Sequence, residues 1–398
     1  MSEMLSVDGA LARLLEGVRP LAETETLPAD AGLGRVLATD LASGVTVPPF
    51  DNAAMDGYAL RVADWDAQTW LPVSQRIPAG HPAQPLQPGS AARIFTGAPV
   101  PEGADAVAMQ EDAEIQDGAV RVLRAPRPGD HLRRAGEDIR TGQVVLQAGV
   151  RLGPAQLGVA AAVGAERLTV RRRLRVAVFF TGDEIVLPGQ PLPPGRIYNS
   201  NRATLIALLR QMGAEVTDLG QVQDSLEATA AVLERASREA DVVVTTGGVS
   251  VGEEDHVKAA VERLGRLDMW KVSMKPGKPL AFGRVGEADF LGLPGNPVSA
   301  FVVFCLFARP FLLARMGASA RPALSVTVPA GFTRAKPGQR REFLRARLEQ
   351  GRAVLFPNQG SGVLTSMAWA DGLADVDAGV SVQPGDLVRF IPLAELLQ

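Results

Sequence analysis

Between residues 174 and 303, short apolar segments alternate with amphipathic ones, and no other feature restricts the possible folds as strongly. The apolar segments include LRVAVFF, DVVVTTGG and DFLGLPG, whose length and content are typical of buried strands. Between them, NRATLIALLRQMG and DSLEATAAVLERASREA have the spacing of helices, with Gly213 as the stop of the first and Asp224 or Ser225 as the cap of the second. Strands that alternate with helices form a doubly wound, mostly parallel sheet. We therefore predict an α/β domain over residues 171–320.

The rest of the chain predicts smaller units. Pro and Gly recur every few residues in 44–140 and again after 321, where apolar runs are short. This pattern is typical of small β-rich domains with many turns. We predict a multi-domain α/β protein made of an N-terminal helical segment (1–26), a connecting domain (27–43 and 141–170), a β-rich domain (44–140), the α/β domain and a C-terminal β domain (321–398).

Charge and composition exclude several classes of function. The net charge is −3 and only 5% of residues are aromatic, so no basic surface for nucleic acid is expected. The apolar segment VSAFVVFCLFARPFLLARM is interrupted by Arg309-Pro310, and we expect no membrane span. The N-terminus lacks the basic start and apolar core of a signal peptide, and the lone Cys305 excludes an internal disulfide. We expect a cytoplasmic protein.

A glycine pair, Gly247-Gly248, follows the apolar run DVVVTT and precedes an expected helix. Backbone N–H groups at such a turn can bind an anion such as a phosphate, and ligands of doubly wound sheets bind beyond the carboxyl ends of the strands. Neither a P-loop motif nor G-x-G-x-x-G is present, which excludes P-loop NTPases and ordinary dinucleotide-binding enzymes. On its own, this turn is nearly as compatible with a tight turn that binds nothing.

Acidic residues end several predicted strands of the same sheet. They are Asp183, Glu184, Asp224 and Asp255, the last of these next to Glu253 and Glu254. Two like charges about 4 Å apart repel by roughly 4 kcal/mol at an effective dielectric constant near 20, so carboxylates beside a phosphate need a counter-ion. Mg²⁺ prefers one or two carboxylates together with phosphate oxygens and water. Any one of these acids alone is more simply a solvated loop residue, and the prediction of a Mg²⁺ site depends on the set.

Lysine is concentrated in one part of the chain. Among 41 basic residues, the lysines are Lys258, Lys271, Lys275, Lys278 and Lys336. A chain that uses arginine almost everywhere retains lysine in KPGKP, which suggests a need for compact ammonium charges at Lys275 and Lys278. We interpret Lys258 and Lys271 as surface charges.

The remaining reactive side chains show no catalytic pattern. His81, His131 and His256 lie far apart without the spacing of metal ligands, and we interpret each as structural or solvated. Cys305 lies in an apolar segment, where a small buried side chain is expected rather than a nucleophile. No Ser/His/Asp set is recognisable.

Eight segments in chain order resemble one family. They are PPFDNAAMDGYA, RIFTGAPVPEGAD, TGDEI, NSNR, TTGGVSVGEED, KPGKPLAFG, GLPGNPVSAF and NQGS, and they are similar to the molybdopterin molybdotransferases, which include MoeA and the E domain of gephyrin. The resemblance implies a transferase of molybdenum cofactor biosynthesis that inserts molybdate into adenylylated molybdopterin with Mg²⁺-dependent release of AMP. It also implies an elongated homodimer in which the β-rich domain of one subunit faces the cleft of the other.

The resemblance also assigns roles to individual residues. The implied catalytic residues are Asp56, Thr96, Glu184, Asp224 and Asp255, of which Asp255, Asp224 and Glu184 would also hold Mg²⁺. The implied substrate-binding residues are Gly247, Gly248, Val249 and Ser250 for phosphates, and Lys275, Lys278, Arg345 and Ser361 for molybdate. Asp56 and Thr96 would reach the cleft of the other subunit.

Two other functions remain open at this stage. A molybdopterin adenylyltransferase has a similar sheet and glycine turn, but it is one short domain, and the β domains and KPGKP argue against it. Such an enzyme is instead a candidate partner that delivers substrate. A dimeric scaffold that binds partner peptides is the non-enzymatic alternative, against which the complete set of acids and lysines argues.

Overall fold

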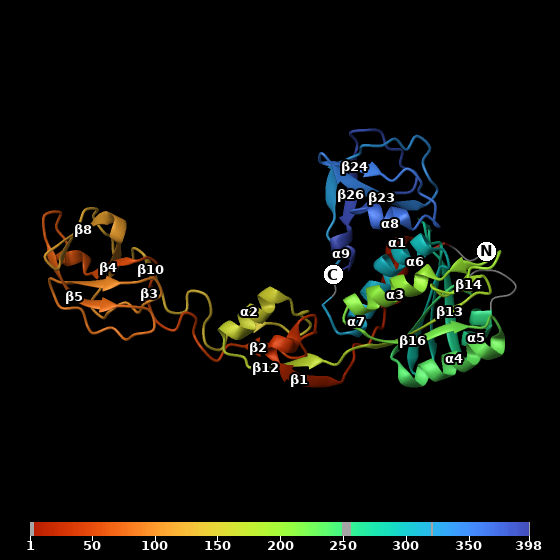
Figure 1. Ribbon diagram of the computed structural model, residues 1–398, viewed down its shortest axis with the longest axis horizontal. Coiled ribbons are helices and arrows are strands. Elements are labelled where there is room, and N and C mark those ends of the chain that lie inside the picture. Colours follow the sequence, from red (N-terminus) through yellow and green to blue (C-terminus); the bar gives the residue numbers. More distant parts are fainter. Residues whose placement is uncertain (1–3, 249–255, 320, 398) are drawn as a thin grey trace.

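The computed structural model describes residues 4–248, 256–319 and 321–397. The chain is elongated (Figure 1). The β-rich domain lies at one end, the α/β domain lies at the other, and the connecting domain lies between them. The C-terminal domain sits beside the α/β domain, so the four domains are not arranged in simple chain order.

The α/β domain is built on a six-stranded sheet with the order β16-β13-β17-β21-β20-β18. Its strands are β13 (Arg175–Thr181), β16 (Glu215–Val222), β17 (Val242–Thr246), β18 (Gly265–Lys271), β20 (Pro279–Val285) and β21 (Ala288–Leu293). The first four in spatial order are parallel, whereas β20 is antiparallel to both of its neighbours. The predicted doubly wound, mostly parallel sheet is therefore confirmed.

Helices cover both faces of this sheet. Its central strands are therefore buried on both sides and consist of apolar residues throughout. One face packs against α1 (Val7–Leu15), α3 (Ser200–Gln211), α6 (Pro297–Val303), η4 (Phe304–Ala308) and α7 (Arg309–Arg315). The other face packs against α4 (Leu226–Glu239) and α5 (His256–Leu264). The adjacent residues Phe179 and Phe180 of β13 are both fully buried, one in each of the two cores.

Local sequence signals explain where these helices begin and end. Ser6 caps α1 by accepting a hydrogen bond from the backbone N–H of Gly9. Ser225, rather than Asp224, caps α4, with its hydroxyl oxygen accepting from the N–H of Ala228. Gly213 has φ of 89° immediately after α3, so the predicted stop of that helix is confirmed.

The apolar segment 297–315 is one continuous helical run, so the expected interruption at Arg309-Pro310 is wrong. Pro310 is the second residue of α7, directly beyond Arg309 and the π-helical turn η4, and in this first turn its missing N–H costs little. The run is long and apolar enough to cross a membrane, yet most of it is buried inside the α/β domain, as in the core helix of a globular domain. Cys305 lies in this run and is 2% exposed.

The connecting domain pairs segments from both sides of the β-rich domain. Strand β1 (Thr24–Pro28) pairs with β12 (Arg167–Arg171), and β2 (Leu41–Ala42) pairs with β11 (Val144–Leu146). The single turn η1 (Ala29–Gly32) and helix α2 (Pro154–Ala162) pack over them.

The β-rich domain has a six-stranded sheet with the order β7-β4-β6-β5-β9-β8. Its elements are β3 (Asn52–Ala53), β4 (Gly57–Leu60), η2 (Val62–Asp64), β5 (Leu71–Ile77), β6 (Ala91–Ile94), β7 (Ala106–Met109), η3 (Gln110–Asp112), β8 (Ala113–Gln116), β9 (Ala119–Val122) and β10 (Leu132–Arg133). Gly57 allows β4 to approach β7 closely, because a Cβ at this position would lie 1.9 Å from the carbonyl oxygen of Ala108.

The C-terminal domain recruits one strand from the α/β region. Its elements are β22 (Val326–Pro329), β23 (Arg341–Glu349), β24 (Arg352–Leu355), α8 (Thr365–Trp369), β25 (Gly372–Val376), β26 (Leu387–Pro392) and α9 (Leu393–Leu397). The short strand β19 (Met274–Lys275) pairs in parallel with β23, and this pairing attaches the KPGKP loop to the C-terminal domain.

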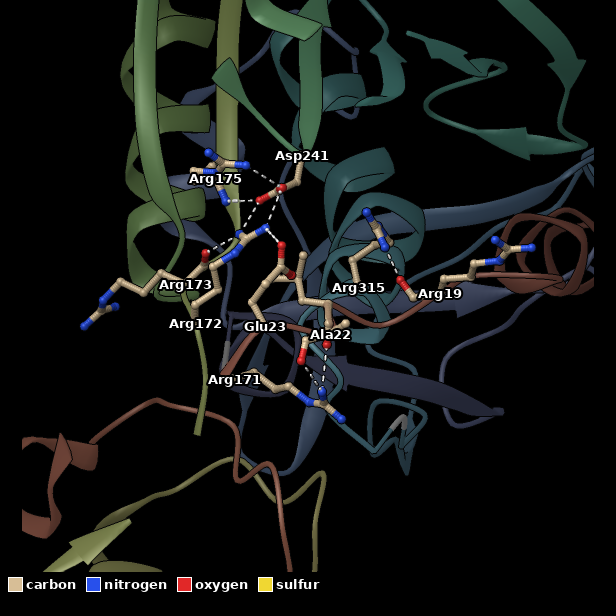
Figure 2. A network of polar contacts seen from close by, with 10 residues as sticks. Arg19, Ala22, Glu23, Arg171, Arg172, Arg173, Arg175, Asp241 and Arg315 are labelled. Atoms are coloured by element: carbon tan, nitrogen blue, oxygen red, sulfur yellow. Dashed lines mark hydrogen bonds and ion pairs between the residues drawn. The ribbon is translucent and has the colours of Figure 1, made fainter. Parts of the chain in front are cut away.

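A polar network fixes the entry of the chain into β13 (Figure 2). The guanidinium of Arg172 donates to both carboxylate oxygens of Asp241 at 2.7 and 2.9 Å, and the Arg175 guanidinium donates to the same carboxylate at 3.1 Å. Arg171 donates to the carbonyl oxygens of Leu21 and Ala22, so the connecting domain is tied to the N-terminal segment. Burial opposes ionisation of Asp241, but these hydrogen bonds outweigh it and lower its pKa to about 2.

Candidate functional site

The carboxyl ends of the four parallel strands meet at one edge of the sheet. Thr181, Val222, Thr246 and Leu293 are the last residues of these strands. The loops that follow them contact one another, since the Thr181 hydroxyl donates to Asp224 at 3.1 Å. The N–H of Gly247 donates to the carbonyl oxygen of Leu293 at 3.3 Å. The structure thus brings Glu184, Asp224 and the glycine turn to one edge, where doubly wound sheets bind ligands.

The glycine turn after β17 requires glycine at both positions. Gly247 and Gly248 have φ of 83° and 61°, a region that other residues rarely adopt. A Cβ at Gly248 would lie 2.5 Å from Cγ2 of Val257, the second residue of α5. Val249, Ser250 and Asp255, which the sequence assigns to this site, lie outside the described residues, so their predicted roles stay predictions.

The loop after β13 folds back on itself beside this turn. A Cβ at Gly182 would lie 2.5 Å from Oε2 of Glu184, so the carboxylate rests over the glycine backbone. The Gln221 amide donates to the carbonyl oxygens of Gly182 and Ile185 at 3.2 and 2.9 Å and holds the loop. Glu184 and Asp183 are exposed and Asp224 is half-buried, so these carboxylates remain accessible to a ligand.

Asn201, at the start of α3, is a further residue of this edge. Its side-chain amide donates to the carbonyl oxygen of Gly295 at 2.7 Å and to the hydroxyl of Thr246 at 3.4 Å. It therefore joins the loops after β17 and β21. Its segment, NSNR, is a recognisable motif, but the sequence contains no sign that this particular asparagine bridges two strand ends.

The KPGKP loop lies at the same edge because β20 runs antiparallel to β21. Nζ of Lys275 is 3.6 Å from Oε1 of Glu342 on β23, while the Lys278 side chain is exposed. Glu342 is only 4% exposed and accepts two hydrogen bonds of 2.6 Å from Arg334. The guanidinium of Arg340 also reaches the loop, donating to the carbonyl oxygen of Met274 at 3.1 Å. Arg340 is thus a further cation beside Lys275 that the sequence patterns did not single out.

Ser361 reaches the edge from the C-terminal domain. Its carbonyl oxygen accepts a hydrogen bond of 3.0 Å from the N–H of Val298, in the first turn of α6 directly after β21. Two domains therefore contribute to this part of the site. The α/β domain carries the lysines, and the C-terminal domain carries Ser361.

Arg345 is buried in this structure, and its predicted contact with molybdate stays a prediction. Its side chain is 1% exposed, and it donates to the hydroxyl of Ser366 at 3.1 Å and the carbonyl oxygen of Gly360 at 3.2 Å. Burial lowers the pKa of this guanidinium to about 10. The Gln359 side chain exchanges two hydrogen bonds of 2.9 Å with the backbone of Arg345. Arg345 therefore holds the loop that carries Ser361.

Asp56 and Thr96 form a separate cluster in the β-rich domain. Oδ1 of Asp56 accepts from the backbone N–H of Thr96 at 2.8 Å and from its hydroxyl at 2.9 Å. These bonds, the backbone one first, lower the pKa of Asp56. The Arg93 guanidinium stacks on Phe95 nearby, 4.7 Å from the ring centroid. This domain lies at the opposite end of the molecule from the α/β domain (Figure 1), so one chain does not bring Asp56 and Asp224 together.

The described acids suit a metal ion that also binds its substrate, rather than a closed protein cage. Among the residues that the structure describes, no three His, Cys, Asp or Glu side chains are grouped closely enough to hold a metal ion. Glu184 and Asp224 at the sheet edge match the one or two carboxylates that Mg²⁺ takes when phosphate oxygens complete its coordination.

Cys305 takes no part in the site. Burial raises the pKa of its thiol to about 12, so it is a small core side chain, as the sequence predicts.

Family models cover most of the chain. Residues 5–164 match the model described as MoeA N-terminal region (domain I and II), and residues 177–314 match the one described as a probable molybdopterin binding domain. Residues 327–393 match the MoeA C-terminal region (domain IV).

Relatives that align over most of the chain agree with these matches. A molybdopterin molybdenumtransferase of Haemophilus influenzae is 43% identical over 316 residues, covering 79% of this chain and 78% of that protein. Molybdopterin molybdenumtransferase 2 of Mycobacterium tuberculosis is 39% identical over 400 residues, covering 95% and 97%. The solved structure of the molybdopterin biosynthesis moeA protein from Pyrococcus horikoshii OT3 superposes with a TM-score of 0.83 at 29% identity, covering 98% of this chain and 100% of that one.

Proposed function

This chain belongs to the MoeA family of molybdopterin molybdenumtransferases, a family of transferases in molybdenum cofactor biosynthesis, and we propose that it inserts molybdate into adenylylated molybdopterin with release of AMP. The observation that carries this proposal is the meeting of two unlike groups at one sheet edge. A phosphate-type glycine turn and two carboxylates lie on one side, and the KPGKP lysines with Ser361 lie on the other.

The glycine turn would bind the phosphates of the adenylylated substrate. Gly247 and Gly248 both have positive φ and carry no side chain, so a phosphate oxygen could approach their backbone N–H groups closely. Asn201 would preserve the spacing between this turn and the loop at Gly295. By family resemblance, Val249 and Ser250 would extend the same surface.

Lys275, Lys278 and Ser361 would bind molybdate. Ammonium groups and a hydroxyl suit a tetrahedral dianion, and charge-assisted hydrogen bonds are the strong ones in such a site. Glu342 limits where the Lys275 ammonium can lie, and Arg345 orients the Ser361 loop from behind. The Lys278 side chain is exposed and could close on the anion.

Mg²⁺ would be held by Glu184 and Asp224, together with Asp255 as the family resemblance implies. When bound, the ion would supply Lewis acidity and neutralise the repulsion between these carboxylates and the substrate phosphates. The Thr181 hydroxyl, by donating to Oδ1 of Asp224, would orient that carboxylate toward the site.

Asp56 and Thr96 would act in the site of a second subunit, which requires a homodimer. The hydrogen bonds from Thr96 end on Oδ1 of Asp56 and keep the carboxyl ionised, and Oδ2 accepts no hydrogen bond from the described part of the chain. That oxygen could orient a water molecule that attacks the phosphoanhydride. It could also accept a proton from this water molecule. We also propose that the protein is cytoplasmic and receives its substrate from a molybdopterin adenylyltransferase.

The test is AMP release from purified protein that is given adenylylated molybdopterin and Mg²⁺, with and without molybdate. Molybdate-dependent AMP release, with formation of cofactor that reactivates a molybdenum-free enzyme, is the expected result. Tight substrate binding without turnover would instead support the scaffold alternative and remove the catalytic roles given to Asp56 and Asp224.

A further inference from the structure

The β-rich domain carries two arginines and one phenylalanine in contact with one another, next to the Asp56–Thr96 pair. The guanidinium carbon of Arg76 lies 4.6 Å from the ring centroid of Phe95, and that of Arg93 lies 4.7 Å from the same centroid. An aromatic ring attracts guanidinium groups through its negative face. Two positive charges therefore converge on the ring that directly precedes Thr96 in the chain.

The sheet of this domain explains why the two arginines meet. Strands β5 and β6 are parallel neighbours, and Arg76 is the register partner of Arg93. The next residues of the two strands, Ile77 and Ile94, are 1% and 0% exposed. Because successive side chains of a strand point to opposite faces, both arginines lie on the sheet face opposite to these isoleucines.

Arg93 is engaged by the loop that carries Asp56. Its guanidinium donates to the carbonyl oxygen of Gly57 at 3.1 Å and to the side-chain oxygen of Gln110 at 2.6 Å. The backbone N–H of Gln110 in turn donates to the carbonyl oxygen of Asp56 at 3.1 Å. The hydrogen bonds from Thr96, and to a smaller extent the charge of Arg93, lower the pKa of Asp56. Arg93 thus holds this loop and offsets the charge of its carboxylate.

Arg76 touches the same ring but has a different environment. Its side chain is exposed, and it makes no hydrogen bond or ion pair with any residue in 4–248, 256–319 or 321–397. The contact with Phe95 restricts where the guanidinium can lie, while its N–H donors stay available. A guanidinium in this state can donate to two oxygens of one phosphate group.

The role proposed above for Asp56 calls for such a cation. In the cleft of a second subunit, this carboxylate would lie next to the phosphoanhydride of the substrate, and like charges at such short distances repel. Arg93 offsets the charge of Asp56 itself. A second cation on the same domain would offset the charge of the phosphate that approaches it, and Arg76 is placed to do so through its contact with Phe95.

We propose that Arg76 binds a phosphate group of the adenylylated substrate in the cleft of the second subunit. This inference rests on the proposed function, because it places Arg76 and Asp56 on the same phosphoanhydride. Asp56 would act on the attacking water molecule, and Arg76 would hold a phosphate oxygen. Arg93 is a positioning residue that touches the loop of Asp56 rather than the substrate.

The first test measures equilibrium binding of adenylylated molybdopterin and Mg²⁺, without molybdate, to the wild type and to Arg76→Gln. We expect the dissociation constant to rise about tenfold, because a charge-assisted contact is lost. Arg124→Gln is the matched control and should leave binding unchanged, since Arg124 is an exposed arginine of the same domain without a described ring contact. A parallel titration with AMP identifies the phosphate. An equal loss would indicate the phosphate of the AMP part, and unchanged AMP binding would indicate the phosphate of the molybdopterin part.

The second test asks in which subunit Arg76 acts. A mixed dimer of an Asp56→Asn chain and an Asp224→Asn chain would contain one intact site, made by the β-rich domain of the Asp224→Asn chain. Arg76→Gln on that chain should raise the KM for adenylylated molybdopterin about tenfold in AMP release, with the KM for molybdate unchanged. The same change on the Asp56→Asn chain would lie in the defective site and should leave both KM values as they were.

Three results would overturn the inference. They are unchanged binding by Arg76→Gln, an equal loss in the Arg124→Gln control, and a rise in KM when the change is on the Asp56→Asn chain. Failure of the proposed function gives a different result. The wild type would then bind the substrate without molybdate-dependent AMP release, and the weaker binding by Arg76→Gln would still be measured. Absence of substrate binding by the wild type would overturn both.

Discussion

The clamp on Asp241 makes a quantitative prediction about stability. Asp241 immediately precedes β17, is 8% exposed, and is held by Arg172 and Arg175 at the point where the connecting domain joins the sheet. Its pKa is lowered from 3.8 to about 2. We predict that Asp241→Asn, which keeps the shape but removes the charge, destabilises the α/β domain.

The size and sign of the effect follow from linkage. One pKa unit corresponds to about 1.4 kcal/mol, so a decrease of a little under two units corresponds to about 2 kcal/mol of stability at neutral pH. Because the folded-state pKa is lowered, this contribution is fully present above the unfolded-state pKa near 3.8 and is lost as the pH falls toward 2. The wild type and the variant should therefore differ most above pH 5, and the difference should shrink below pH 4.

Urea unfolding followed by hydrogen exchange of the β13 and β17 amides is the suitable assay, since it reports on this domain rather than on all four. Glu234→Gln is the matched control. It removes an exposed ion pair with Arg238 on α4 in the same domain, and such pairs contribute about 0.5 kcal/mol or less. Equal effects of the two variants, or a difference between wild type and Asp241→Asn that persists unchanged at pH 2, would refute the reasoning.

Three further predictions concern the site. Gly248→Ala should weaken substrate binding by about tenfold or more, because the new Cβ would lie 2.5 Å from a valine side chain of α5 and displace the turn; equilibrium binding of adenylylated molybdopterin measures this. Lys278→Gln should raise the molybdate concentration needed for half-maximal AMP release by about tenfold, with binding of the adenylylated substrate unchanged. Chains with Asp56→Asn and chains with Asp224→Asn should each be inactive. Mixed into dimers, they should recover about a quarter of wild-type activity, because half the dimers would then contain one intact site of two. No recovery after subunit exchange would contradict the shared cleft.

Much of the site could be located from the sequence because it depends on local patterns. Buried strands and amphipathic helices have recognisable periodicities, and parallel strands end at a common edge. Glu184, Asp224 and Gly247 could therefore be assigned to one edge before any coordinates were known. The KPGKP lysines stood out for a compositional reason, since the chain otherwise uses arginine.

Other residues could not be placed in this way. Arg345 matches a family motif, but its burial behind Ser366 and Gly360 depends on packing in the C-terminal domain. Asn201 and Arg340 act through contacts with segments about 45 to 94 positions away. The pairing of β19 with β23 is equally non-local, because the partner of an edge strand is chosen by the tertiary fold rather than by either strand alone.

The sequence by itself determined which segments become strands, helices and turns, because these depend on side-chain periodicity and on glycine and proline at particular positions. It also determined the family, because several short motifs occur together and in order. Only the tertiary structure decided which charges are exposed and which are buried. It placed the β-rich domain, which carries Asp56, at the far end of the molecule and buried the Arg345 guanidinium. The physical reason is that burial and charge pairing depend on how whole domains pack, and residues far apart in the chain then share one environment.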